Sequence, residues 1–167
     1  IDWRDWSSDV CSSDLENIKF QKFSTEYKLL RAFAKVVKDE SPEVLAGWNF
    51  LGFDMMTIYN RMRKLGVDFN SISPVGLSSV DMKKYGKIFI YGIHVMDLLD
   101  LYKELTYSVE ESYKLDYVAN KHLKTGKVSY GGSLDQLYEE DIETCINYSG
   151  KDTELLEKLD DRLGHVD

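Results

Sequence analysis

A short apolar segment between two amphipathic segments constrains the fold of this chain most. Residues 42–49, PEVLAGWN, predict a buried strand, because the apolar run is short and begins with a proline. The preceding segment predicts a helix that begins at Ser24 or Thr25 as N-cap, since its apolar residues repeat at helical spacing: Leu30, Phe33, Ala34 and Val37. Residues 53–66 predict a second amphipathic helix that stops at Gly66. A helix–strand–helix order of this kind indicates an α/β fold.

The rest of the chain predicts a loop, a β-rich segment and then mostly helices. Turn-forming residues dominate 70–86, whereas 87–97 is rich in strand formers, with bends at Gly86 and Gly92. Helices are expected at 98–107, at 112–123 with Ser112 as cap, and at 133–164 with Gly164 as stop. The C-terminal half is therefore expected to be helix-rich.

The composition excludes several classes of protein. The net charge is −8, so binding to nucleic acid by simple neutralisation of phosphates is not expected. A carboxylate-rich site that reaches phosphate through Mg²⁺ remains compatible with this charge. No apolar run approaches the roughly 18–20 residues of a membrane-spanning helix. Two cysteines and three histidines show no metal-ligand spacing, so a reducing, cytoplasmic compartment is expected.

The first residues differ in character from the rest of the chain. Residues 5–15, DWSSDVCSSDL, contain a near-repeat and no helical or strand periodicity. They resemble the translation of a common sequencing-adapter oligonucleotide. We therefore expect residues 1–15 to be a non-native segment that does not pack into the core, and residues 16–167 to be the native part.

Asp54 stands at the junction between the predicted strand and the second helix, in GWNFLGFD. In an α/β sheet this junction lies at the carboxyl edge of a strand, where functional sites gather. Asn49 ends the strand and Phe53 precedes the aspartate. The simpler alternative is that Asp54 caps the helix or adds a favourable charge to its first turn.

A second acidic motif, YSGKD, lies at residues 148–152 in the last predicted helix. Tyr148 and Asp152 are four positions apart and share one helix face. The alternative is a surface tyrosine and a solvated aspartate. Gly150 inside this helix costs about 1 kcal/mol relative to alanine, which suggests either close approach by a neighbouring group or mere tolerance of the glycine.

Together the two motifs resemble the Exo II and Exo III motifs of family B DNA polymerases. The segments SPVG, HVMDLLDLYKE and KLDYVANKHLKTGKVSYGG resemble the proofreading domain of the tailed-bacteriophage enzymes of this family. YSGKD departs from the more usual Tyr-Asn at its second position. The resemblance covers about residues 20–164 and implies a ribonuclease-H-like α/β fold.

The resemblance also implies a role for particular residues. Asp54 and Asp152 would be catalytic carboxylates that bind two Mg²⁺ ions, with Mn²⁺ as a possible substitute, and Tyr148 would orient the attacking water. Asn49 and Phe53 would contact the terminal nucleotides. Lys127, in GKVSYGG, matches a lysine near the scissile phosphate. Asp54 and Asp152 are accordingly expected to converge on one cleft.

The family has a further Asp-x-Glu motif, Exo I, on an earlier strand. No such motif in strand context lies between Glu16 and Asp54, so the fold is expected to be incomplete, without its N-terminal strands. The chain is then a fragment of a DNA-directed DNA polymerase with 3′–5′ exonuclease activity, and is expected to be inactive in isolation. Its expected partners are a single-stranded 3′ end, primer–template DNA, the polymerase domains and a sliding clamp, in the cytoplasm of a phage-infected bacterial cell.

Two alternatives remain open on the sequence. One is a standalone exonuclease of the same fold, without polymerase modules. The other is a catalytically dead exonuclease-like domain, kept as a scaffold that binds single strands or partner domains. Flanking sequence separates these alternatives, through the presence or absence of Asp-x-Glu and of the polymerase modules.

Overall fold

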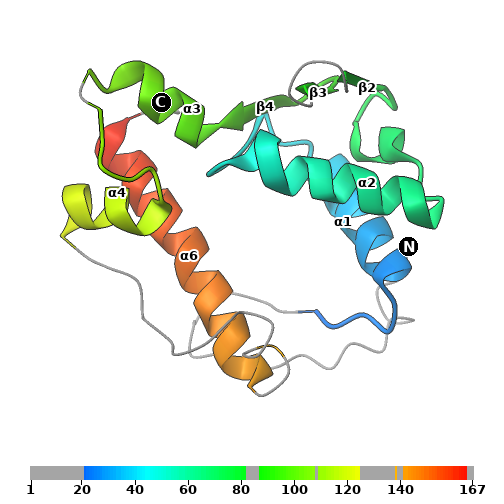
Figure 1. Ribbon diagram of the computed structural model, residues 1–167. Helices are drawn as coiled ribbons and strands as arrows, with labels where there is room; N and C mark the ends of the chain where they lie inside the picture. Colours follow the sequence, from blue (N-terminus) through cyan, green and yellow to red (C-terminus); the bar gives the residue numbers. More distant parts are fainter. Residues whose placement is uncertain (1–20, 82–86, 108, 125–137, 139–140, 165–167) are drawn as a thin grey trace. The chain divides into compact units, whose positions relative to one another are not determined.

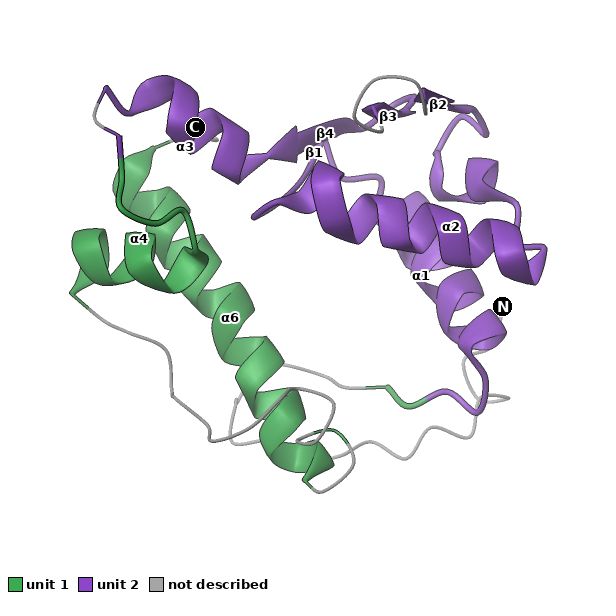
Figure 2. Cartoon of the chain, viewed as in Figure 1, with its two compact units in different colours: residues 1–22, 110–167 green, residues 23–109 purple. Residues whose placement is uncertain are grey.

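The computed structural model describes residues 21–81, 87–107, 109–124, 138 and 141–164 (Figure 1). The chain divides into two compact units (Figure 2). One comprises Phe23–Val109, and the other comprises Ile1–Lys22 with Glu110–Asp167. No helix in the described part of the chain is long and apolar enough to cross a membrane.

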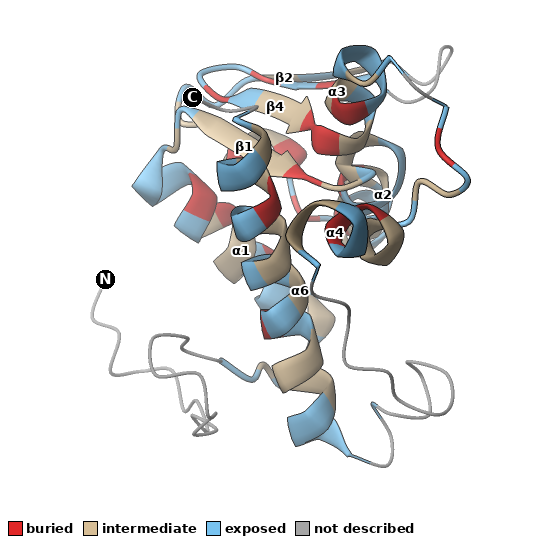
Figure 3. Cartoon of the chain, turned by 90° about the vertical axis from the view of Figure 1, so that its left-hand side faces the viewer, coloured by how far each residue is buried: buried red, intermediate tan, exposed pale blue. Residues whose placement is uncertain are grey.

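Helix α1, Glu26–Glu40, opens the first unit and confirms the predicted helix. Thr25 caps it, since its side chain accepts a hydrogen bond from the Lys28 amide at 3.3 Å. Leu30, Ala34 and Val37 are buried along one stripe of the helix (Figure 3). The three- and four-residue spacing in the sequence therefore marks the face that packs on the core.

Two short strands pair in parallel at the centre of this unit. Strand β1, Val44–Gly47, lies beside β4, His94–Asp97, with Val44 opposite His94 and Gly47 opposite Asp97. Because the strands run in the same direction, their carboxyl ends meet at one edge. Helices α2, Met55–Leu65, and α3, Leu98–Leu105, start from that edge, after β1 and β4 respectively. This arrangement confirms the α/β class.

The prediction of a loop over residues 70–86 is wrong in two places. Phe69–Ile72 forms the 3₁₀ helix η3, and Ser78–Asp81 forms strand β2, which pairs antiparallel with β3, Lys87–Ile90. SSVD is too short and polar to show strand periodicity, and its partner strand supplies the ladder that the local sequence does not predict. Gly92 bends the chain between β3 and β4 with a φ of 92°.

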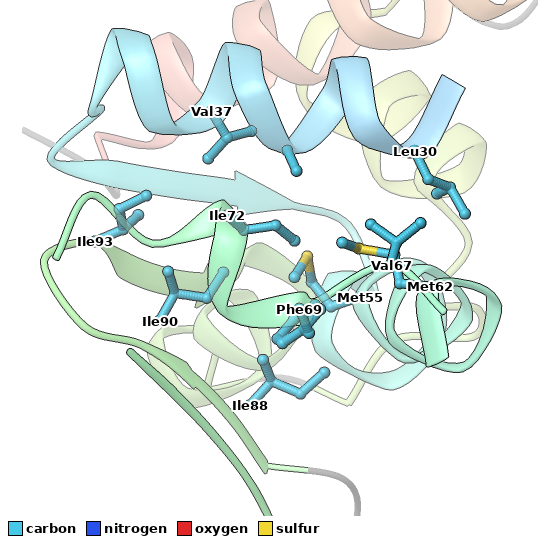
Figure 4. Close-up of a cluster of buried hydrophobic side chains, with 11 residues drawn as sticks. Leu30, Val37, Met55, Met62, Val67, Phe69, Ile72, Ile88, Ile90 and Ile93 are labelled. Atoms are coloured by element: carbon cyan, nitrogen blue, oxygen red, sulfur yellow. The ribbon is translucent and has the colours of Figure 1, made fainter. Parts of the chain in front are cut away.

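The core of this unit collects side chains from helices α1 and α2, from η3, and from the segment that begins with β3 (Figure 4). Met55 and Met62 of α2 are fully buried within it, together with Ile72 of η3. Ile88 and Ile90 of β3 face the same cluster, while Phe89 between them is exposed. The core therefore fixes α2 from its first residue, directly after Asp54.

The second unit contains helices α4, Leu115–Leu123, and α6, Ile142–Leu163, which pack against each other. Ser112 does not cap α4 as predicted; the N-cap position is Lys114, whose amide donates to the Ser112 hydroxyl at 3.3 Å. The helix expected over 133–164 is interrupted at Asp141, which is the N-cap of α6 and accepts from the Thr144 amide at 3.0 Å. Residues 133–137 and 139–140 lie outside the described residues. Gly164 ends α6 as predicted, with a φ of 63°.

Candidate functional site

The candidate site lies at the carboxyl edge of the parallel strand pair. After β1 the chain turns at Asn49, which has a left-handed conformation with φ 57° and ψ 31°. Phe50–Asp54 then form one turn of π-helix, η2, which runs directly into α2. Single π turns of this kind are rare and occur frequently at functional sites.

Two glycines allow this tight path. A Cβ atom on Gly47 would lie 2.7 Å from the Phe50 ring, and a Cβ atom on Gly52 would lie 2.7 Å from the Asn49 side-chain oxygen. Both distances are far below an ordinary contact between non-bonded atoms. The glycines in GWNFLGFD therefore let the turn fold tightly against the strand end.

The turn exposes the residues that the sequence predicts to be functional. Phe53 is 64% exposed, although phenylalanine is normally an interior residue. Asp54 is also exposed, while Met55 beside it is fully buried. Met55 therefore anchors the turn, and Phe53 and Asp54 point away from the core.

Asp54 stands at the N-cap position of α2 but does not cap it through its side chain, and nothing in its geometry tests the alternative of a favourable charge at the first turn. Asp54 has helical backbone angles, and its side chain makes no capping hydrogen bond. Partial desolvation, the largest cause, raises the pKa of the Asp54 carboxyl above its usual value; a hydrogen bond with its own backbone lowers the pKa by less, and the negative charge of Asp97 adds the smallest, upward contribution. The carboxylate thus sits where a nearby positive charge would be favourable.

Asp97 is a part of this edge that the sequence reasoning missed. It is 7% exposed, and its two carboxylate oxygens accept from the Leu51 amide of η2 and from the Leu99 amide of α3, each at 3.0 Å. An aspartate between a β-rich run and a helical run is a recognisable N-cap signal for α3. Its bond to Leu51 depends on the pairing of β1 with β4, which the local sequence does not reveal.

Tyr148 and Asp152 lie on α6 in the second unit, and both are half-buried. The structure confirms that YSGKD is helical, so the two side chains share one face. Gly150 between them is buried, whereas Ser149 and Lys151 are exposed.

The structure brings Asn49, Phe53 and Asp54 together in one turn, and Tyr148 and Asp152 together on one helix. The two units are described separately, so the convergence of Asp54 and Asp152 stays a prediction. Lys127 and residues 1–15 lie outside the described residues. Among the residues that are described, no three histidine, cysteine, aspartate or glutamate side chains form a group that could hold a metal ion.

Known proteins resemble this chain over most of its length. A sequence model described as "DNA polymerase family B, exonuclease domain" matches residues 7–118, a range that starts within the segment expected to be non-native. The DNA-directed DNA polymerase of Escherichia phage RB69 is 30% identical over 148 residues, which are 84% of this chain and 16% of that protein. The corresponding enzyme of Enterobacteria phage T4 is 29% identical over 160 residues, 92% of this chain and 18% of that protein.

Similarity extends beyond phages. DNA polymerase 1 of Saccharolobus solfataricus is 34% identical over 157 residues, covering 89% of this chain and 16% of that protein. The chain thus spans less than a fifth of the length of each of these curated relatives. The T4 match covers so much of the chain that the Asp54 turn, Tyr148 and Asp152 all fall within it.

Proposed function

Because this chain belongs to the exonuclease domains of DNA polymerase family B, we propose that it serves the proofreading activity of a DNA-directed DNA polymerase. The reaction is hydrolysis of the terminal nucleotide from a single-stranded 3′ end. The observation that carries this proposal is Asp54: an exposed carboxylate that makes no capping hydrogen bond, at the carboxyl edge of a parallel strand pair. That edge is where α/β folds place their sites.

Exonuclease domains of this family are generally metal-dependent. The surroundings of Asp54 fit a cation ligand, since partial desolvation and, to a lesser extent, the neighbouring charge of Asp97 disfavour its ionised form, which a divalent cation would stabilise. We assign Asp54 and Asp152 as ligands of two Mg²⁺ ions, for which Mn²⁺ is a chemically similar substitute. When bound, the ions supply positive charge that favours a nucleophilic water and the leaving 3′-oxygen.

The other predicted residues hold and orient the substrate. Phe53 presents an exposed ring next to Asp54, which suits stacking against a terminal base. Asn49 places an amide side chain at the start of the same turn, within reach of a nucleotide. We assign Tyr148 to orientation of the attacking water and Lys127 to the scissile phosphate, both on the family resemblance.

The proposed partners follow from the family and from the lengths of the relatives. The chain covers 16% and 18% of the RB69 and T4 polymerases, so we propose that it works with other polymerase domains on primer–template DNA. We also propose a sliding clamp as a partner and the cytoplasm of a phage-infected bacterial cell as the location.

The experiment that tests the function measures loss of a mismatched 3′ nucleotide by a polymerase that carries this segment. Asp54→Ala or Asp152→Ala should abolish editing almost wholly, because each removes a charged ligand. Tyr148→Phe should be milder and retain measurable cleavage, because positioned groups typically contribute on the order of 10²–10⁴-fold. Chelation of the divalent ions should stop editing in every variant.

Primer extension by the same variants is the matched control, and it should survive all three substitutions. Editing at the wild-type rate in Tyr148→Phe would remove the assignment of α6 as the Exo III helix. Loss of extension together with editing would instead favour the scaffold alternative, in which the domain supports the polymerase structurally.

A further inference from the structure

Asp97 joins three elements at the edge where the candidate site lies. It is the last residue of β4 and directly precedes α3. One carboxylate oxygen accepts from Leu99 at 3.0 Å and caps α3, and the other accepts from Leu51 at 3.0 Å, in the first turn of η2. A single side chain therefore links β4, α3 and the turn that presents Asp54.

The bond to Leu51 is of a strong type. Amides in the first turn of a helix have no carbonyl partner within the helix, so they require an acceptor from elsewhere. Asp97 supplies a charged acceptor from a residue 46 positions away, and it is buried, which strengthens such a bond. Leu51 lies two residues before Phe53 and three before Asp54, so whatever holds Leu51 also fixes the start of that turn.

We propose that Asp97 is a positioning residue of the exonuclease site, because its carboxylate clamps Leu51 and so sets the placement of Phe53 and Asp54. Asp97 acts through the backbone and does not itself contact the substrate. Its role in the reaction rests on the function proposed above. The clamp itself is a property of the fold and is measured independently of activity.

Substitutions at position 97 separate the clamp from the helix cap and from the charge. Asp97→Asn removes the charge and leaves one oxygen for two amide donors, so either Leu99 or Leu51 loses its acceptor. Asp97→Glu keeps the charge and displaces the oxygens by one methylene. Asp97→Ser keeps a good N-cap that is too short to reach Leu51, so it removes the bond to Leu51 alone. Asp100→Asn is the matched control, an exposed acid in the first turn of α3.

Two measurements on the full chain test the proposal. Hydrogen exchange of the Leu51 amide should be about 10- to 100-fold faster in Asp97→Ser, the size of a lost bond to a charged acceptor, while amides within α3 keep their protection. Affinity for a fluorescent single-stranded oligothymidylate in MgCl₂ should fall about fivefold or more, the lower end of the contribution of one base–aromatic stack. Asp97→Glu should show both losses, and Asp100→Asn neither.

Wild-type exchange of Leu51 in Asp97→Ser would overturn the clamp. Loss of Leu51 protection with unchanged DNA affinity would overturn the positioning role, because the turn would then have lost its bond to Asp97 with no effect on DNA binding. Wild-type behaviour of Asp97→Glu would show that charge matters rather than placement, and would also overturn it. Failure of the wild-type chain to bind single-stranded DNA would overturn the proposed function, while Leu51 exchange still decides whether the clamp exists.

Discussion

An alanine at position 47 should disrupt the turn that presents Asp54. The added Cβ would lie 2.7 Å from Cδ2, 3.0 Å from Cγ and 3.1 Å from Cβ of Phe50. Carbon atoms in contact normally lie about 3.5–4.0 Å apart, so all three contacts are too short. Rotation of the Phe50 ring relieves only two of them, because the Cβ atom of Phe50 is bonded directly to the backbone.

The expected cost follows from this geometry. Gly47 is buried in β1, so the backbone of residues 47–50 must shift within a packed environment. Overpacking of this kind typically costs about 1–3 kcal/mol of unfolding free energy. For a chain of this size, each kcal/mol lowers the melting temperature by about 2–4 °C, which gives a total decrease of about 2–12 °C.

The assay is thermal unfolding followed by circular dichroism, in a double-mutant cycle with Phe50→Ala. Removing the ring eliminates the contacts with Cδ2 and Cγ and leaves only the contact with the Phe50 Cβ atom. Gly47→Ala should therefore cost less unfolding free energy in the Phe50→Ala background. Equal costs in both backgrounds would refute the steric argument. A melting temperature of Gly47→Ala within about 1 °C of wild type would refute it as well.

Three further predictions concern single residues. Gly52→Ala should leave the melting temperature nearly unchanged and weaken binding of single-stranded DNA, because its Cβ would meet only the movable end of the Asn49 side chain; unchanged affinity in an anisotropy titration would contradict this. Lys121→Met should lower the urea-unfolding free energy by about 1–3 kcal/mol, because the Glu110 side chain, which is 3% exposed, then loses its bonds of 2.6 and 2.7 Å to Lys121. Glu110→Gln should cost less, because the Lys121 side chain that loses its charged partner is 45% exposed and can be hydrated. Asp54→Asn should be more stable than wild type near pH 7. Because the folded-state pKa of Asp54 is raised, the wild type has its full stability below the unfolded value of 3.8 and loses part of it as pH rises through the folded value, whereas asparagine does not titrate. Urea titrations near pH 7 and in acid should show that the advantage of Asp54→Asn disappears on acidification.

The sequence predicted those parts of the fold whose signals are local. Helix α1 carries its cap and its apolar spacing within one segment, and α2 follows a strand that ends in a recognisable motif, although the sequence does not predict the π turn η2 between them. Strand β2 is not predicted, because SSVD is paired by β3 rather than specified by its own residues. The start of α6 differs from the expected one, because the Asp141 side chain bonds to Thr144 and caps the helix.

The candidate site shows the same division between local and distant signals. Asn49, Phe53 and Asp54 are neighbours in sequence, so GWNFLGFD places them at one strand-to-helix junction, whereas their exposure on one turn is seen only in the structure. The role of Asp97 requires the parallel pairing of two strands that are far apart in the chain. No pattern within a window of ten residues carries that information, since HVMD predicts only a strand and the start of a helix.

The parallel pairing of β1 with β4 also sets the order of events as the chain is synthesised. Leu51 is translated 46 residues before Asp97, so the turn that carries Asp54 leaves the ribosome well before its clamp exists. Closing a flexible loop of that length costs about 3 kcal/mol of chain entropy, which the pairing of β1 with β4 and the packing of the core must offset. The turn that carries Asp54 therefore reaches its final conformation late, once β4 and the first turn of α3 have emerged. Before that point the nascent chain has neither the β1–β4 strand pair nor the Asp97 bond that fixes this turn.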